Sequence, residues 1–316
     1  MKSQWKALMK YIKKKIKIEK QIMNETRVNN INNPRKSWNA VKGIMNEHGR
    51  IESNPENISN IINDYFIYKT NKLRESTSPA QVDHKERIKM QIGNKLENVP
   101  EYNLHEIDTR IFRKVMKESK GGTASGHTTI DGNSLKIAAP ILEDAMIHFI
   151  NLSIRECKFA TMWKHLTIHP RFKKGDPCLK ENQRPVAHIE EMGKVTERVV
   201  AEQMLTHMHK HGLLSKDQHG ATKHHSPTTA TTTINEQLLH SAKNKKLASL
   251  LLIDLTAAYD LIDRDILEEK LDAYRFGDTT RTWMKSYLMN RTQEVEVSGK
   301  KSTILRMEVF RADCCS

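Results

Sequence analysis

Two short stretches of this sequence carry side chains whose types and spacing suit metal and phosphate chemistry. In the first, residues 246–255, an apolar run leads directly into Asp254. If this run is a buried strand, Asp254 stands where the strand ends, which is where ligands bind in open sheets. A carboxylate there can hold Mg²⁺, which prefers hard oxygen ligands. The alternative is that Asp254 only caps the amides of its own turn, and the segment alone leaves both interpretations open.

The second stretch, "RFKKGD" at residues 171–176, places Lys173 and Lys174 beside a Gly-Asp turn signal. Apolar residues alternate before it, so we expect two strands joined by a loop that holds both lysines at an exposed tip and brings Arg184 nearby. A basic hairpin tip can bind phosphates, and arginine can do so with two parallel hydrogen bonds. The alternative is a solvated pair of surface lysines.

The overall charge favours an anionic partner. The 316 residues include 52 Lys and Arg against 38 Asp and Glu, a net charge of +14. Such an excess is typical of proteins that bind nucleic acid or an anionic membrane surface. A basic protein without such a ligand is the competing interpretation.

Targeting and redox signals are sparse. No stretch reaches the ~18 consecutive apolar residues of a membrane span, and no N-terminal signal peptide is recognisable. The four cysteines form no C-x-x-C pair, which predicts reduced thiols, no cysteine zinc site and an intracellular location in nucleus or cytoplasm. The histidines at 207, 209 and 211 are expected at the surface.

The elements that must position these residues can be read from periodicity. Residues 1–100 are basic and helical in pattern, with an amphipathic lysine-rich helix near residues 5–16 and further helices near 38–45 and 58–75. Beyond them we expect a cap and a helix within residues 103–120, a helix at 135–159 and a helix at 263–274 capped by Asp263. Short strands are expected at 165–172 and 182–189, and a fully buried strand at 246–255.

Several segments, in a fixed order, resemble a known family. They are "GGTASGHTTIDGNSLKIAAPIL", "TMWKHLTIHPRFKKGD", "NQRPVAHIEEMGKVTERVV", "LLSKDQHGATKHHSPTTA", "LLIDLTAAYDLIDRDIL" and "WMKSYLMNRTQEVEVSG". Together they are similar to the reverse transcriptases of non-LTR (LINE-type, jockey/RTE-like) retrotransposons. No single motif is specific, but their order and spacing are.

The resemblance implies an α+β fold: an incomplete right-hand polymerase with fingers and the start of a palm. Residues 1–100 would be a basic helical connector and residues 101–316 a truncated reverse transcriptase domain. It implies that Asp254 is a catalytic ligand of two Mg²⁺ ions and that Tyr259 excludes the ribose 2′-hydroxyl. Lys173 or Lys174, and Arg184, would hold the incoming dNTP, and Gln218 matches a Gln-x-Gly step. An RNA template and a DNA primer would be the partners, with no membrane and no stable protein partner.

The sequence also departs from the family pattern. Gly126-His127-Thr128 stands where Gly-Pro-Asp is usual, and His188 stands where a small or apolar residue is usual. The 316 residues contain no adjacent Asp-Asp pair, which in the family completes the metal site. We therefore expect a truncated fragment, without the Asp-Asp motif and thumb, that is inactive on its own. The alternative is a non-catalytic basic remnant that binds nucleic acid.

Overall fold

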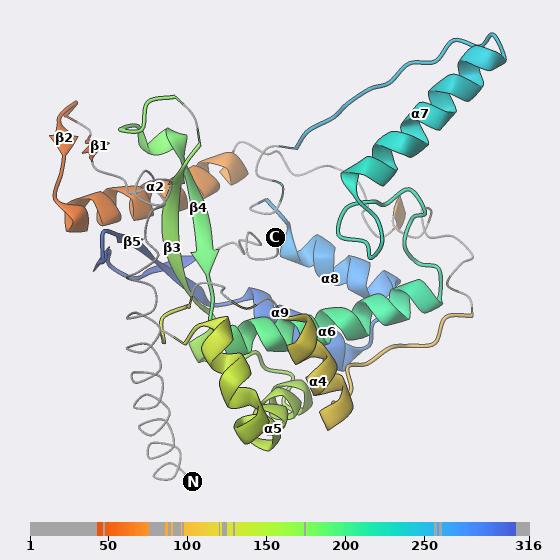
Figure 1. The fold of residues 1–316 in the computed structure, drawn as a ribbon, viewed down its shortest axis with the longest axis horizontal. Coiled ribbons are helices and arrows are strands. Elements are labelled where there is room, and N and C mark those ends of the chain that lie inside the picture. Colours follow the sequence, from red (N-terminus) through yellow and green to blue (C-terminus); the bar gives the residue numbers. More distant parts are fainter. Residues whose placement is uncertain are drawn as a thin grey trace, which may run out of the picture.

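The elements of the protein combine helices and sheet in the α+β class, as the sequence predicts (Figure 1). The computed structural model describes residues 43–46, 48–75, 86–87, 90, 96, 98–119, 121, 125–128, 130–173, 175–255, 258 and 261–307. The predicted basic helix near residues 5–16 lies outside this range, as do Lys174 and Tyr259.

One five-stranded sheet is built around β3 (His165–Phe172). β3 pairs antiparallel with β4 (Gln183–His188) and parallel with β5 (Arg291–Val297). β5 also pairs with the short strands β6 (Lys300–Lys301) and β7 (Leu305–Met307). Hydrogen bonds therefore flank β3 on both sides, and the two predicted strands at 165–172 and 182–189 are confirmed.

Helix α2 (Pro55–Glu75) covers one face of this sheet. Apolar side chains at helical spacing on α2 meet alternate residues of β3, β4 and β5, as the two periodicities require. The cluster they form contains Ile58, Ile62, Phe66, Leu166, Ile168, Ala187, Val295 and Val297. The predicted helix at 58–75 is confirmed, and its function in the fold is to close the inner side of the sheet.

A buried polar network fixes α2 against β5. The Asn63 Nδ2 donates to Ser302 Oγ at 2.9 Å, and Gln293 Nε2 donates to Asn63 Oδ1 at 2.7 Å. Ser302 Oγ in turn accepts from the backbone amide of Val295 at 2.9 Å. Because buried polar groups are costly when unpaired, this network permits only one register between helix and strand.

The chain before α2 forms a small hairpin instead of the end of a helix. β1 (Ile44–Met45) pairs antiparallel with β2 (Ile51–Glu52). The prediction of a helix near 38–45 is therefore wrong at its described end. The amide of Met45 donates to the carbonyl of Cys178 at 2.8 Å, so this segment is held by backbone contacts to the loop before β4.

A second layer contains α4 (Thr109–Glu118), α5 (Gly132–Arg155) and α6 (Glu191–Lys210), which share a separate apolar cluster. Asp108 and Asp131 cap α4 and α5 by accepting from the amides of Ile111 and Ser134. The predicted cap and helix within residues 103–120 are thus confirmed, as is the helix predicted at 135–159, which begins at Gly132 and ends at Arg155. Cys157, just after α5, and Cys178, in the loop between β3 and β4, are free thiols.

Helix α5 is the one helix among the described residues that is long and apolar enough to cross a membrane by length and composition. The sequence analysis did not single it out. Met146 and Ile150 on its inner face are buried against α4 and α6, whereas Ile137 and Ile141 near its start are exposed. Its apolar character thus serves, in part, the core of the second layer.

A third cluster joins the helical layer to the sheet. Phe159, Trp163 of the short helix η3 (Thr161–Trp163), Val200, and Trp283 of α9 (Asp278–Leu288) pack together. Buried Arg291, the first residue of β5, lies over the ring of Tyr287 at 4.4 Å and donates to the Tyr287 carbonyl. Its guanidinium approaches buried Glu197, whose pKa is raised above its usual range by burial.

His207 near the end of α6 corrects one prediction. Its ring is buried, 4.6 Å from that of Tyr102 and 5.6 Å from that of Phe276, whereas it was expected at the surface. His209, two positions on, is exposed as expected. Side chains two positions apart on a helix lie on different faces, so histidines at alternate positions cannot all face solvent. Here His207 is the one that belongs to the core.

Candidate functional site

The β3–β4 hairpin forms the expected basic end. Arg171 and Arg184 are directly paired across the two strands, and the amide of Lys173 donates to the carbonyl of Asn182 at 2.8 Å. The loop between them turns at Gly175, with φ +86, and contains the short helix η4 (Lys180–Asn182). Arg171, Lys173 and Arg184 are all exposed. The structure thus brings together two of the predicted phosphate-binding residues, Lys173 and Arg184, and adds Arg171.

Arg171 and Arg184 are paired although like charges directly opposite each other destabilise a strand pair. This cost points to an anionic ligand that offsets the repulsion. Within the described part of the chain, neither Arg171 nor Arg184 forms an ion pair with a carboxylate. Two forked guanidinium groups with unused donors suit an anion such as phosphate. We name this set, Arg171, Lys173 and Arg184, the basic end of the hairpin.

The basic end continues into a polar face on the side of the sheet opposite α2. Because side chains alternate along strands, residues at every second position share this face. It consists of His165, Thr167, His169 and Arg171 of β3, Arg184 and His188 of β4, and Thr292 and Glu294 of β5. The alternation in β3 of His165, Thr167 and His169 with Leu166 and Ile168 carried this signal in the sequence.

The histidines of the polar face are held neutral. The rings of His169 and His188 lie 4.4 Å apart. Burial, followed by the neighbouring charge of His169, lowers the pKa of His188 to about 4. The pKa of His169 is likewise lowered, chiefly by burial. These pKa shifts mean that the face carries its positive charge on the two arginines, not on imidazolium groups.

The segment 246–255 differs from its prediction. We expected a fully buried strand ending at Asp254; instead the segment has no strand partner among the described residues and lies open to solvent. Leu251 and Leu252 are each 81% exposed and Ile253 is 78% exposed. The chain here runs from the far end of α7 (Pro227–Lys243) back toward the body of the molecule (Figure 1). A strand needs a neighbour to satisfy its amides, and the described residues provide none here.

Asp254 is therefore not part of an assembled metal site. Within the described residues it belongs to no group of three or more metal-binding side chains. No hydrogen bond or ion pair joins it to the basic end of the hairpin in that part of the chain. The described residues thus do not by themselves fit two Mg²⁺ ions at Asp254, and its catalytic role stays a prediction.

Gln218 lies in the exposed loop between α6 and α7. Its side-chain amide donates to the carbonyl of Gly220 at 2.9 Å, so in this structure it closes its own turn and does not reach a substrate-binding surface. The helix α7 that follows has a full capping box at Ser226 and Thr229 but no buried residue. Local capping, not packing, defines this helix.

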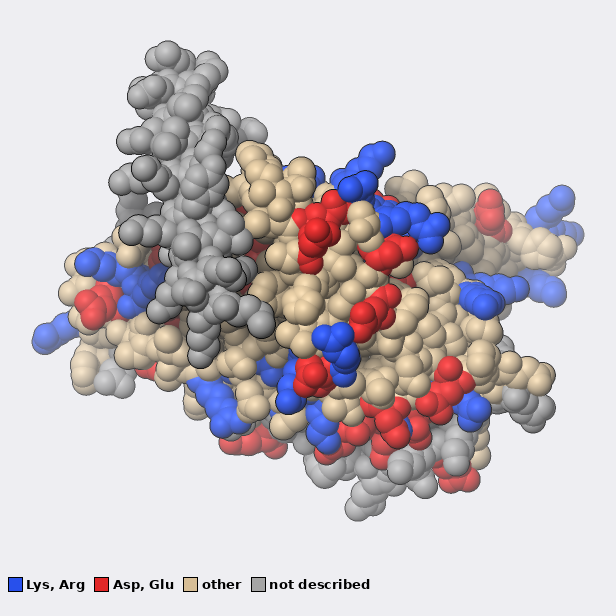
Figure 2. Space-filling model, turned by 90° about the horizontal axis from the view of Figure 1, so that it is seen from below, with Lys and Arg blue, Asp and Glu red and all other residues tan. Residues whose placement is uncertain are grey.

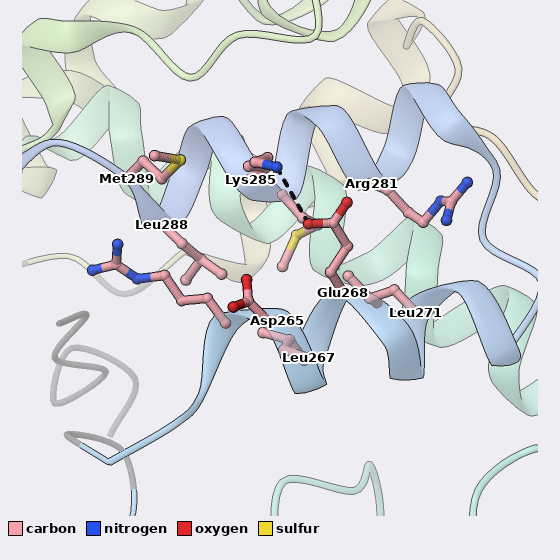
Figure 3. Close-up of a pocket in the computed structure, with 10 residues that line it drawn as sticks. Asp265, Leu267, Glu268, Leu271, Arg281, Lys285, Leu288 and Met289 are labelled. Atoms are coloured by element: carbon pink, nitrogen blue, oxygen red, sulfur yellow. Dashed lines mark hydrogen bonds and ion pairs between the residues drawn. The ribbon is translucent and has the colours of Figure 1, made fainter. Parts of the chain in front are cut away.

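A groove between α8 (Arg264–Ala273) and α9 holds none of the predicted site residues (Figure 3). The predicted cap of α8 is confirmed, since Asp263 accepts from the amides of Asp265 and Ile266. Lys285 of α9 reaches across to Glu268 of α8, with Nζ 3.4 Å from Oε2. This ion pair bridges the groove between the two helices, so the groove does not provide the site.

On the face shown in Figure 2, Lys and Arg are interspersed with Asp and Glu. The basic end of the hairpin is a local cluster of positive charge, of the kind that contacts nucleic-acid phosphates.

Comparison with known proteins shows similarity to reverse transcriptases. The family model described as "Reverse transcriptase (RNA-dependent DNA polymerase)" matches residues 172–309, from the end of β3 past β7. The RNA-directed DNA polymerase from mobile element jockey of Drosophila melanogaster is 25% identical over 206 residues. Residues 172–309 are therefore similar to reverse transcriptases, and the chain resembles those of non-LTR retrotransposons. The resemblance seen in the sequence motifs is thereby confirmed.

The similarity to the jockey reverse transcriptase covers 64% of this chain but 21% of that relative. The range matched by the family model begins just after Arg171 and includes Lys173, Arg184, Gln218 and Asp254, together with Tyr259, which lies outside the described residues. The reverse-transcriptase relationship therefore spans both the ordered hairpin and the exposed segment 246–255.

Proposed function

We propose that this chain contributes the fingers and the first palm segment of an RNA-directed DNA polymerase with a right-hand fold. Its substrates would be an RNA template, a DNA primer and dNTPs. The relationship to reverse transcriptases supports the substrate class. The observation that carries the proposal is the basic end of the hairpin, where Arg171 and Arg184 face each other without a carboxylate partner in the described part of the chain.

In this proposal, Arg171, Arg184 and Lys173 bind phosphate groups of the dNTP or of the nucleic-acid backbone. Lys174, the next lysine in the loop, would add a further charge. Arginine guanidinium groups suit this role because their planar donors match two phosphate oxygens at once. Asp254 would hold Mg²⁺, and Tyr259 would select the sugar, once residues 246–255 are held beside a partner strand.

We further propose that the 316-residue chain, assayed alone, binds nucleic acid but does not polymerise DNA. Asp254 lies on an exposed segment, and the sequence has no adjacent Asp-Asp pair to complete a two-metal site. The second candidate function is binding of nucleic acid without catalysis. It is favoured because the basic hairpin is formed, whereas the segment that carries Asp254 has no partner strand among the described residues.

The first test is salt-dependent binding of a single-stranded RNA. Arg171→Ala and Arg184→Ala should each weaken binding and reduce the slope of log K against log salt by roughly 0.7, the value for one lost phosphate contact. Arg110→Ala is the matched control, because Arg110 is an exposed arginine on α4, beside Asp108. Equal losses in all three variants would remove the hairpin from the proposal.

The second test is primer extension on an RNA template with Mg²⁺ and dNTPs. The wild-type chain and Asp254→Asn should give the same background incorporation. Incorporation that disappears in Asp254→Asn would show that the chain polymerises DNA and would leave only the family assignment standing.

A further inference from the structure

Three side chains from separate parts of the sequence converge on the polar face, away from Asp254. They are His127 in the loop before α5, His165 at the start of β3, and Glu294 in the middle of β5. Their ligand atoms all lie within 4.8 Å of one another, and they are the one such group of three among the described residues. Neither the reverse-transcriptase relationship nor the proposed polymerase function assigns a role to this group.

The spacing of the cluster fits a small divalent ion. His165 Nε2 lies 3.4 Å, and His127 Nδ1 3.6 Å, from Glu294 Oε1. Ligands at about 2.0–2.1 Å from a tetrahedral zinc ion are separated by about 3.3–3.4 Å. The two distances to Glu294 therefore already stand close to the spacing of tetrahedral corners, and the two histidine nitrogens lie within 4.8 Å of each other. His127 is exposed, so a fourth position beside it is open to water.

Neighbouring hydroxyls orient the partly buried His165 and the buried Glu294. His165 Nδ1 lies 2.9 Å from Thr292 Oγ1, and Thr167 Oγ1 donates to Glu294 Oε1 at 3.2 Å. If Nδ1 donates its proton to Thr292, the lone pair of Nε2 points toward the cluster. Nε2 is buried and has no hydrogen-bond partner, because 3.4 Å to Glu294 is a charge contact and not a well-formed hydrogen bond. A metal ion would satisfy this atom.

The third ligand is carried by a loop that is held in place without it. The amide of Thr128 donates to Glu190 Oε1 at 2.7 Å, and its hydroxyl donates to the other oxygen of the same carboxylate. A Cβ at Gly126 would lie 2.7 Å from the backbone nitrogen of Glu190, so only glycine permits this close approach. The loop thus presents His127 to the sheet in a fixed position.

A cation of the chain itself already lies at the cluster. The ammonium of Lys301 on β6 donates to Glu294 Oε1, and its Nζ lies 3.5 Å from His127 Nδ1. Lys301 contacts two of the three ligands from a side chain that is 37% exposed. Because this side chain is partly exposed, its ammonium can move into solvent when a metal ion takes its place at the buried carboxylate of Glu294.

We propose that His127, His165 and Glu294 bind a divalent transition metal ion of the zinc type, and that Lys301 occupies its place when the metal is absent. Imidazole and carboxylate ligands suit zinc, and three protein ligands with one open position is a common zinc arrangement. The ion would join the 125–128 loop to β3 and β5. It would be separate from any Mg²⁺ at Asp254.

The test is calorimetric titration of the full chain with Zn²⁺, together with the zinc-induced rise in the midpoint of thermal unfolding. One equivalent should bind to the wild type. His165→Ala and Glu294→Gln should each weaken this binding by about 100-fold, at the upper end of what altering a site's ligand environment costs. The thermal shift caused by Zn²⁺ should fall in parallel.

The Lys301→Ala variant is the sharpest test of the metal site, because it keeps all three ligands and removes only the competing cation. We expect roughly fivefold tighter binding of Zn²⁺, because the metal ion no longer has to displace an ammonium group from Glu294, and a larger zinc-induced thermal shift than in the wild type. This arm remains decisive if Glu294→Gln fails to fold, since a gain of affinity cannot arise from unfolding.

The matched control is the pair His219 and His225, whose ring centroids are 5.0 Å apart, against 5.1 Å for His127 and His165. In the described residues this pair belongs to no group of three ligands. His219→Ala should leave the one equivalent intact. The proposal is overturned if His219→Ala weakens binding as much as His165→Ala, or if Lys301→Ala weakens it.

Discussion

Strand β3 alternates apolar and polar residues, whereas the segment 246–255 is an apolar run that leads into Asp254. Both were predicted as strands, and only the first forms one. β3 lies between β4 and β5 with α2 on one face, and Leu166 and Ile168 are fully buried. The segment 246–255 has no such neighbours in the described part of the chain, and Leu252 is 81% exposed. An apolar segment can form a strand, but whether it does so depends on neighbouring strands that pair with its backbone.

The largest expected effect of this difference is in amide hydrogen exchange. Amides of residues 166–168 should exchange only on global unfolding, with protection of about 10³-fold or more for a domain of ordinary stability. Amides of residues 250–253 should exchange near the rate of an unstructured peptide. Exchange measured by mass spectrometry after proteolysis resolves both segments, and strong protection at 250–253 would abolish the contrast.

A pair of identical substitutions tests the same contrast in stability. Ile168→Ala removes a fully buried side chain from the α2–sheet cluster and should lower the free energy of unfolding by about 3 kcal/mol. Ile253→Ala removes the same atoms from a side chain that is 78% exposed, and should change it by less than about 0.5 kcal/mol.

Urea denaturation followed by circular dichroism measures both free energies. Equal losses in the two variants would mean that residues 246–255 are packed in solution, contrary to the structure.

The smallest expected effect concerns pH. The folded state keeps His188 neutral down to a pKa of about 4, whereas an unfolded chain protonates it near 6.5. The unfolded state therefore binds more protons between these values, and stability should fall as the pH drops from 7 toward 4. His188→Val should flatten this dependence in thermal unfolding curves.

The control for the pH prediction comes from the other region. His240→Val alters an exposed histidine of α7, the helix that leads into residues 246–255. It should leave the pH dependence unchanged. If both variants flatten the curve equally, the buried polar face is not the source of the acid sensitivity.

Much of the fold could be predicted from local patterns. The helices capped by Asp108, Asp131 and Asp263 were found because a cap and an apolar stripe are both local signals. The β3–β4 hairpin was found because its strands are neighbours in sequence. β5 was not predicted, because its parallel pairing with β3 is long-range and leaves no signal near either strand.

The site was predicted in part for the same reason. Lys173 and Arg184 lie on one hairpin, so local reasoning brought them together. Arg171, opposite Arg184, was quoted in the motif but not assigned, although strand pairing places it there. The His127, His165 and Glu294 cluster could not be found, because a loop and two strands that are distant in sequence must first be assembled.

The contacts of α2 have a consequence for where this protein can be cut. The region of family similarity is residues 172–309, but α2 ends at Glu75 and supplies the side chains that close the inner face of the sheet. A fragment trimmed to the similar region would lose α2 and nearly all of β3, and would expose Val295, Val297 and the Asn63-binding side of Gln293 to water. The region that is similar to reverse transcriptases is thus smaller than the region that folds cooperatively. Recombinant fragments of this protein should therefore include α2.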